Sequence, residues 1–568
     1  MLFPHWTPPV DTEILLNTQF FLLYPFDGGG NFIHQEMLGT LDDLEIADRI
    51  MHKGALKDFG EYPNLDFRRF ERWSTIEKDS WINRIYFAAS LGHAYALTKE
   101  PAIATGLKEL LLGFARRYPA PLGKDAIELE RRVLYARDHD YNAKGADFDA
   151  ETEYVWFDFQ PASRAINILN ACWFLRDSNV FTPDEAQELQ SMLLTHIRNI
   201  HDKEQGFYPL GADNHQSVRA LALLYGCEFF KELLPAEAQT WLKTALPLSK
   251  HHIMVDRLPD GMGNDISPSY HFFVTWITRD TLVLLKRLGI QLEGKYLAHA
   301  QKSFDVCHLL RQPDGLSTVI SDGYPLQMDA FLKTLPPQTQ YTGKSSLLST
   351  AKLGIQKEKD AFLLLDCSPL LAQLSHYHGG KQGLTLFLNG THILADSGCC
   401  NYDDTRFATH YKQPFAHSSL LLDGQGDSLL EGRYKWLLAP DCTLSAEGDV
   451  LVSTLTSPLP NWKGVTWKRT AQLISSEEAI VTDDVINPHS RKADFPLILH
   501  PHIRILQCNE HDAILEGKNG KRFALQSELP WTPGDGIGYL PFQCVPCRKL
   551  TIHAQGTHIR NTIRFSSI

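Results

Sequence analysis

The first part of the chain has the hydrophobic spacing of helices. Between about Ser80 and Arg311, apolar residues recur every three or four positions, and proline, glycine or Asp-Gly separates the segments. Proline stands at or near the start of several segments, where its missing N–H costs no hydrogen bond. We therefore expect stacked helical hairpins, with helices over 81–98, 101–118, 161–176, 183–202, 215–233 and 270–288.

Beyond about Lys352 the pattern changes to short runs in which apolar and polar residues alternate. Residues 384–388 and 391–394 read as two strands joined by Asn389-Gly390, a dipeptide typical of type I′ hairpin turns. A second such turn, Asn519-Gly520, lies between two further apolar runs. The sequence therefore predicts a helical domain over 1–345 and an antiparallel β-sandwich over 346–568.

Length and composition agree with a large folded enzyme of more than one domain. A chain of 568 residues exceeds the size at which one hydrophobic core keeps growing, and 43% hydrophobic with 21% charged residues is typical of a folded protein. The net charge of −12 argues against a general nucleic-acid binder. An acidic substrate remains compatible, because a cleft can be locally basic. The arginines that could provide such a cleft include Arg84, although a single arginine is more often a solvated surface charge.

The first residues show no basic segment followed by an apolar run, and no stretch is long and apolar enough to span a membrane. The ten cysteines do not form the dense pattern of a disulfide framework. We expect a cytoplasmic protein without a membrane partner, or a periplasmic one if a leader precedes this sequence.

Two segments place polar side chains at predicted helix starts. Asn214-His215 opens one helix, where a cap by Asp213 or Asn214 is the ordinary interpretation. A glycine-rich loop then leads to Tyr270-His271 at the start of another, where a simple turn with a packed aromatic ring would explain the pattern equally well. Each segment alone is weak evidence for a catalytic site.

A third group of residues could bind a metal ion. His376 and His378 share one face if their segment is a strand, and Asp396 and His417 follow later, so a histidine, an aspartate and a second histidine from neighbouring strands would form a mixed nitrogen and oxygen site. Because the chain holds 24 histidines, a chance grouping stays open.

Taken together and in order, these motifs resemble the heparinase II/III-like family of polysaccharide lyases. The resemblance spans about 75–425, and it departs from the usual family pattern at Asp265, Gly380, Gly383 and Ser418-Ser419, which indicates a divergent branch. The residues that carry it are Asn214-His215, Ser267-Pro268, Tyr270-His271, His376-x-His378, Leu384, Leu386, Asn389-Gly390, Asp396-x-Gly398, Tyr402, Arg406 and Ala416-His417.

The resemblance implies a fold and a set of roles. The helices would form an incomplete (α/α) toroid, and the enzyme would cleave a uronate-containing acidic glycan, glycosaminoglycan or alginate-like, by β-elimination. Asn214 would neutralise the uronate carboxylate, Tyr270 would protonate the leaving oxygen, and His215 or His376 would act as the base. Whether Tyr270 also acts as base stays open. Tyr402, Arg406 and Arg84 would contact the substrate.

The same resemblance implies a divalent ion, zinc or alternatively manganese, held by His378, Asp396 and His417. We expect a structural role for this ion because its ligands would cross-link separate segments, with Lewis-acid catalysis as the alternative.

Two other functions remain open at the level of sequence. A glycoside hydrolase would need a pair of carboxylates, which Asp213, Asp260 and Asp265 could provide. A non-catalytic protein could stack sugars on the aromatic side chains of Tyr154, Trp156 and Phe157, although buried packing is the commoner role of such residues. The sequence specifies neither the glycan, nor endo or exo action, nor the oligomeric state.

Overall fold

A computed structural model describes residues 2–10, 43–68, 82–140, 154–211, 213–323, 325–370, 376–399, 406–540 and 543–568, and these divide into two compact units. The helical unit consists of Met1–Asp256 and Phe273–Ala300, and the β-rich unit of Arg257–Phe272 and Gln301–Ile568.

The predicted boundary at 345/346 stays a prediction. By their packing, Arg257–Phe272 and Gln301–Ile568 form one compact unit. Asp260 accounts for part of that packing. Its carboxylate accepts hydrogen bonds from the backbone N–H groups of Thr350 at 2.7 Å and Ala351 at 2.8 Å. Its backbone carbonyl accepts a hydrogen bond from the Tyr341 hydroxyl at 2.9 Å.

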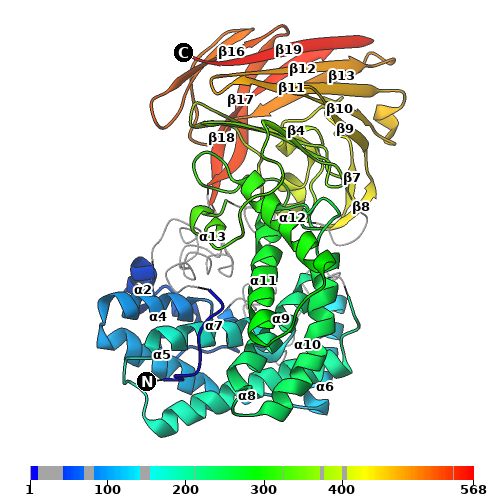
Figure 1. Ribbon diagram of the computed structural model, residues 1–568. Coiled ribbons are helices and arrows are strands. Elements are labelled where there is room, and N and C mark those ends of the chain that lie inside the picture. Colours follow the sequence, from blue (N-terminus) through cyan, green and yellow to red (C-terminus); the bar gives the residue numbers. More distant parts are fainter. Residues whose placement is uncertain are drawn as a thin grey trace. The chain divides into compact units, whose positions relative to one another are not determined.

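The helical unit is a set of packed helices (Figure 1) in which α4 lies against α7, α7 against α9, and α9 against α10. Nearly every residue of α7 is buried, as in a helix covered by neighbours on all sides. Its elements are α2 (Asp43–Met51), η3 (Lys57–Phe59), α4 (Phe87–Thr98), α5 (Pro101–Arg117), α6 (Lys124–Asp140), η4 (Tyr154–Trp156), α7 (Gln160–Leu175), α8 (Pro183–Gly206), α9 (Asn214–Phe230) and α10 (Pro235–Val255). Helices α11 (Pro268–Arg287) and α12 (Gly294–Leu310) each have residues in both units.

Five of the six predicted helices are confirmed with ends within a few residues of the expected ones. Proline occupies the first turn of α5, α7, α8 and α10, and a capping box of Thr182 and Glu185 starts α8. The helix predicted over 81–98 begins later, at Phe87, because Ile85 has a φ of +49° that breaks the helical path.

The β-rich unit contains several antiparallel sheets (Figure 1). One sheet has the order β1-β2-β3-β4-β5, from β1 (Ser345–Leu348), β2 (Leu353–Glu358), β3 (Ala361–Asp366), β4 (Gly383–Leu388) and β5 (Thr391–Leu394). A second has the order β14-β15-β16-β19-β12-β11-β10-β9, from β9 (Asp441–Glu447), β10 (Val450–Thr456), β11 (Thr466–Ser475), β12 (Glu478–Ile486), β14 (Arg504–Cys508), β15 (Asp512–Glu516), β16 (Arg522–Ser527) and β19 (His558–Ser567).

A third sheet has the order β17-β18-β13-β6, and β7 pairs with β8. These strands are β6 (Leu421–Leu422), β7 (Leu429–Glu431), β8 (Lys435–Leu438), β13 (Lys492–Ile498), β17 (Trp531–Leu540) and β18 (Gln543–Gln555). The short helix α13 (Asp329–Leu332) precedes β1. The short helices η5 (Phe407–Tyr411), η6 (Pro414–Ala416) and η7 (Pro460–Trp462) lie between strands along the chain.

One hydrophobic core joins these sheets. Burial alternates along β12 and β19, whereas β4 is buried at every position, so both of its faces are covered. Core side chains include Trp467, Phe495 and Phe565 from three different strands. The predicted hairpin is confirmed, with positive φ angles at Asn389 and Gly390 as a type I′ turn requires. The fold class is therefore confirmed: a helical toroid followed by antiparallel β sheets. Every helix within the described ranges is too short or too polar to cross a lipid bilayer.

Candidate active site

In the helical unit, two candidate catalytic residues occupy the first turn of α9. The Asp213 carboxylate caps this helix by accepting a hydrogen bond from the Gln216 N–H at 2.8 Å. The capping interpretation is therefore correct for Asp213. Asn214 and His215 follow it, and both side chains are partly exposed.

The His215 ring contacts a carboxylate that the sequence analysis missed. Its Nδ1 pairs with Asp158 Oδ2, and the other Asp158 oxygen accepts a 2.6 Å hydrogen bond from Arg219 Nη1. Arg219 also pairs with Glu204 and lies 3.7 Å from the centre of the Tyr208 ring. The partly exposed His215 ring is thus linked through Asp158 to the buried Arg219 and Glu204.

Arg84 and His215 both lie against the ring of Phe159. The Phe159 ring is 4.3 Å from the His215 ring, and the Arg84 guanidinium carbon is 4.2 Å from the centre of the Phe159 ring. Arg84 is only 4% exposed, so it is a buried cation stacked on an aromatic face rather than a solvated surface charge. Its substrate-binding role stays a prediction.

In the β-rich unit, the start of α11 is fixed by a buried histidine. His271 is completely buried; its Nδ1 accepts a hydrogen bond from the Gly263 N–H at 3.0 Å, and its Nε2 donates to the Ser303 carbonyl at 3.0 Å. Burial lowers the pKa of His271 to about 3, so the ring stays neutral. His271 therefore holds the glycine-rich loop in place, while its neighbour Tyr270 is partly exposed.

Tyr270 stacks on His376, with ring centres 4.0 Å apart and planes inclined by 26°. His376 Nδ1 lies 3.0 Å from Oδ2 of Asp322, and its Nε2 lies 3.8 Å from Asp265 Oδ1. Burial alone would lower the pKa of His376, but the charge of Asp265 and the hydrogen bond to Asp322 raise it. The structure thus brings two predicted catalytic side chains into contact.

Asp322, which the sequence analysis also missed, connects this pair to the predicted metal ligands. Its second oxygen, Oδ1, lies 2.6 Å from His378 Nε2. Burial favours the neutral acid, but the charge of Lys412 and the hydrogen bonds from both histidines hold the pKa of Asp322 well below its usual range. The carboxylate is therefore an acceptor for both rings.

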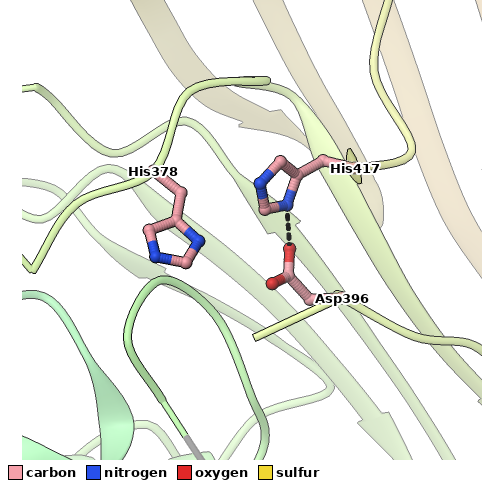
Figure 2. A group of neighbouring side chains, drawn as sticks. All are labelled: His378, Asp396 and His417. Atoms are coloured by element: carbon pink, nitrogen blue, oxygen red, sulfur yellow. Dashed lines mark hydrogen bonds and ion pairs between the residues drawn. The ribbon is translucent and has the colours of Figure 1, made fainter. Parts of the chain in front are cut away.

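His378, Asp396 and His417 come together as predicted, with potential ligand atoms within 4.8 Å of one another (Figure 2). They do not lie on strands, contrary to the expectation. His378 precedes β4, Asp396 follows β5, and His417 follows η6, so irregular segments at the strand ends carry them.

The donor set fits a metal ion. His417 Nε2 must donate to the Tyr411 carbonyl at 2.9 Å, so Nδ1 and Asp396 Oδ2, 2.7 Å apart, need a proton or a cation between them. On His378, Nε2 donates to Asp322, and among the described residues no hydrogen-bond partner reaches the buried Nδ1. Metal-binding histidines commonly donate their second N–H to a carboxylate or carbonyl in this way. The group could therefore hold a metal ion.

The other predicted site residues are less defined. Arg406 directly precedes η5 and is partly exposed, and Tyr402 lies outside the described residues. Among the carboxylates that a hydrolase would need, Asp213 caps α9 and Asp260 accepts backbone N–H bonds, so both have structural roles.

The aromatic residues considered for sugar stacking are buried. Tyr154, Trp156 and Phe157 are 4%, 2% and 3% exposed, so they pack in the interior. A glycan-binding surface built from these three rings is excluded.

Comparison with protein families decides between these functions. The Heparinase II/III N-terminus family matches residues 46–346, and the Heparinase II/III-like, C-terminal family matches residues 344–536. The chain belongs to the heparinase II/III family. It is accordingly a polysaccharide lyase, and the family boundary falls where the sequence pattern changes from helical to alternating.

Solved structures have the same fold as this heparinase II/III-family lyase. A heparinase III is 12% identical with a TM-score of 0.69, over 99% of this chain and 85% of the other. A mutant heparan sulfate lyase from Pedobacter heparinus is 14% identical with a TM-score of 0.60, over 100% and 85%. A chondroitin lyase that is a baculovirus envelope protein is 9% identical with a TM-score of 0.52, over 98% and 82%. No curated protein matches the chain.

Proposed function

We propose that this lyase cleaves a uronate-containing glycosaminoglycan by β-elimination and leaves an unsaturated uronyl residue at the new end. The observation that carries the proposal is the stacked pair of Tyr270 and His376, with His376 oriented by the buried Asp322. The family and the fold shared with a heparan sulfate lyase and a chondroitin lyase support this substrate class.

The reaction removes the proton at C5, next to the uronate carboxylate, and expels the oxygen at C4. A negatively charged carboxylate resists taking up a second charge, so the charge that develops on it needs hydrogen bonds or cations. Asn214 takes this role through its side-chain amide. Tyr270 protonates the leaving oxygen and becomes a tyrosinate as it does so. His215 or His376 accepts the C5 proton.

A divalent ion, zinc or manganese, would be held by His378, Asp396 and His417 and would supply a structural cross-link. Imidazole and carboxylate are ligands that both ions accept. The three ligands belong to different irregular segments of the β-rich unit, so an ion bound to them stabilises only the folded arrangement. Through Asp322, the same arrangement fixes the ring of His376.

Absorbance of the unsaturated product tests the proposal. Purified protein is incubated with heparan sulfate, chondroitin sulfate, hyaluronan and alginate, without nucleotide or redox cofactor. We expect absorbance to grow with at least one glycosaminoglycan, and Tyr270→Phe to lower turnover at least about 10²-fold because it removes the proton donor. Tyr296→Phe, which removes a hydroxyl from a tyrosine on α12, is the control and should keep the wild-type rate. Release of saturated ends only would reject elimination.

A further inference from the structure

Every polar group of Asp158 has a hydrogen-bond partner. Besides the two side-chain contacts to His215 and Arg219, its N–H donates to Glu130 Oε1 at 2.7 Å, and its carbonyl accepts from Lys203 Nζ at 3.0 Å. Its φ of +54° is uncommon for a residue other than glycine, and such backbone conformations persist only where the surroundings fix them. The carboxylate therefore has one orientation, set by its surroundings.

Arg219 places a buried cation beside the Asp158 carboxylate, and such a neighbour favours the charged form of a carboxylate. The guanidinium is buried between Glu204 and Asp158; burial alone would lower its pKa, but these two carboxylates raise it, so the side chain stays a cation. Gln216 donates to the second oxygen of Glu204 at 2.8 Å and so fixes the far end of this chain of contacts. An ionised carboxylate beside a fixed arginine can only accept hydrogen bonds.

The state of the His215 ring follows from that acceptor. Because Asp158 cannot donate, His215 Nδ1 must carry the proton that they share, and in the neutral ring the lone pair then lies on Nε2. Within the described ranges, no hydrogen bond occupies Nε2, and the side chain is 39% exposed. The ring thus combines a buried, oriented Nδ1–H with an available proton acceptor.

We propose that Asp158 is a positioning residue of the lyase, which fixes His215 in the tautomer protonated on Nδ1 so that Nε2 accepts a proton from the substrate. This inference rests on the proposed function. Arg219, itself paired with Glu204, holds the Asp158 carboxylate. Buried charged side chains of the helical unit therefore set the orientation of the partly exposed His215 ring.

The decisive variant is Asp158→Asn, which keeps the shape of the side chain. Its amide can donate to Nδ1, so the neutral ring moves its proton to Nε2 and loses the acceptor. We expect kcat to fall at least about 10²-fold, with KM within about twofold of the wild type, because a group that moves a proton in the transition state is disabled while substrate binding is kept.

Asp43→Asn is the matched control. Asp43 and His93 form another Asp–His pair in the helical unit, with Nδ1 and Oδ2 3.0 Å apart, and the proposal gives that pair no catalytic part. We expect kcat of Asp43→Asn within about twofold of the wild type.

The tautomer is measured independently of turnover. Nitrogen-15 NMR of histidine-labelled protein, at a pH where the ring is neutral and with the signal assigned from its loss in His215→Gln, should show the proton on Nδ1 in the wild type and on Nε2 in Asp158→Asn. A wild-type ring protonated on Nε2 overturns the proposal, even if the variant does not fold. Wild-type kcat in a folded Asp158→Asn overturns it as well. If no glycan yields unsaturated product, the proposed function fails on its own, and the tautomer still tests the positioning.

Discussion

Replacement of Asp322 by asparagine tests how two functional groups of the β-rich unit depend on one carboxylate. Oδ1 accepts from His378 at 2.6 Å and Oδ2 from His376 at 3.0 Å, and both rings donate. Asparagine has a single acceptor oxygen, and its amide group would face the N–H of the second ring. One of the two rings must therefore lose its partner or turn.

The expected loss in the free energy of unfolding follows from these contacts. A hydrogen bond to a charged group contributes about 1.5–3 kcal/mol, and a buried donor left without a partner costs about 1–3 kcal/mol. Because the two contributions overlap, we expect Asp322→Asn to lower the free energy of unfolding by roughly 3 kcal/mol. If His378 is the ring that turns, metal affinity should also fall about 10–100-fold, as with other residues that orient a ligand. If His376 turns, kcat should fall by about 10²-fold.

Urea unfolding, metal content and turnover of the variant measure these effects together. Asp483→Asn is the control, since Asp483 is another fully buried carboxylate of the β-rich unit, paired with Arg469 Nε at 2.7 Å. Breaking that buried pair should cost about 3–5 kcal/mol but leave turnover and metal content intact. If Asp322→Asn matched this control, with lost stability but wild-type turnover and metal, the link between the metal group and His376 would be refuted.

Other changes separate the remaining roles. Asn214→Ala should lower kcat at least about 10²-fold with an unchanged melting temperature, because the amide acts mainly in the transition state; a near-normal rate would contradict its role. Asp396→Ala, or chelation of the wild type, should remove bound metal and lower the melting temperature, whereas His376→Ala should keep the metal and lose rate. Elemental analysis of both variants measures the bound metal. A metal-free wild type with full activity and an unchanged melting temperature would contradict the metal site. Burial lowers the pKa of Lys357 to about 8, below the unfolded value, so the unfolded chain binds more protons between about pH 8 and 10.5 and stability should rise with pH there. Urea titrations across this pH range should show that the free energy of unfolding of the wild type, measured relative to Lys357→Met, rises by roughly 2 kcal/mol, a value reduced for partial solvation. A difference that does not change with pH would contradict the burial effect.

The sequence by itself determined much of the secondary structure and the order of the helical and β-rich parts. Hydrophobic spacing, proline at helix starts and the Asn389-Gly390 turn are local signals, and each depends on residues within a few positions. Residues that share a motif could be found for the same reason. Tyr270 stands next to His271, and His376 lies two positions before His378, so the resemblance to a family indicated them as candidates without a structure.

The tertiary structure alone decided which ions orient these side chains. Asp158 is 57 residues from His215, and Asp322 is 54 residues from His376, and neither lies in a motif. A buried carboxylate is recognisable only when the chain has folded around it, because its effect comes from the loss of water and from partners brought close by packing. For the same reason the sequence left Arg84 open between a solvated surface charge and a substrate contact, whereas the fold buries it against Phe159. The sequence also placed the metal ligands on strands, where the structure has irregular segments at strand ends.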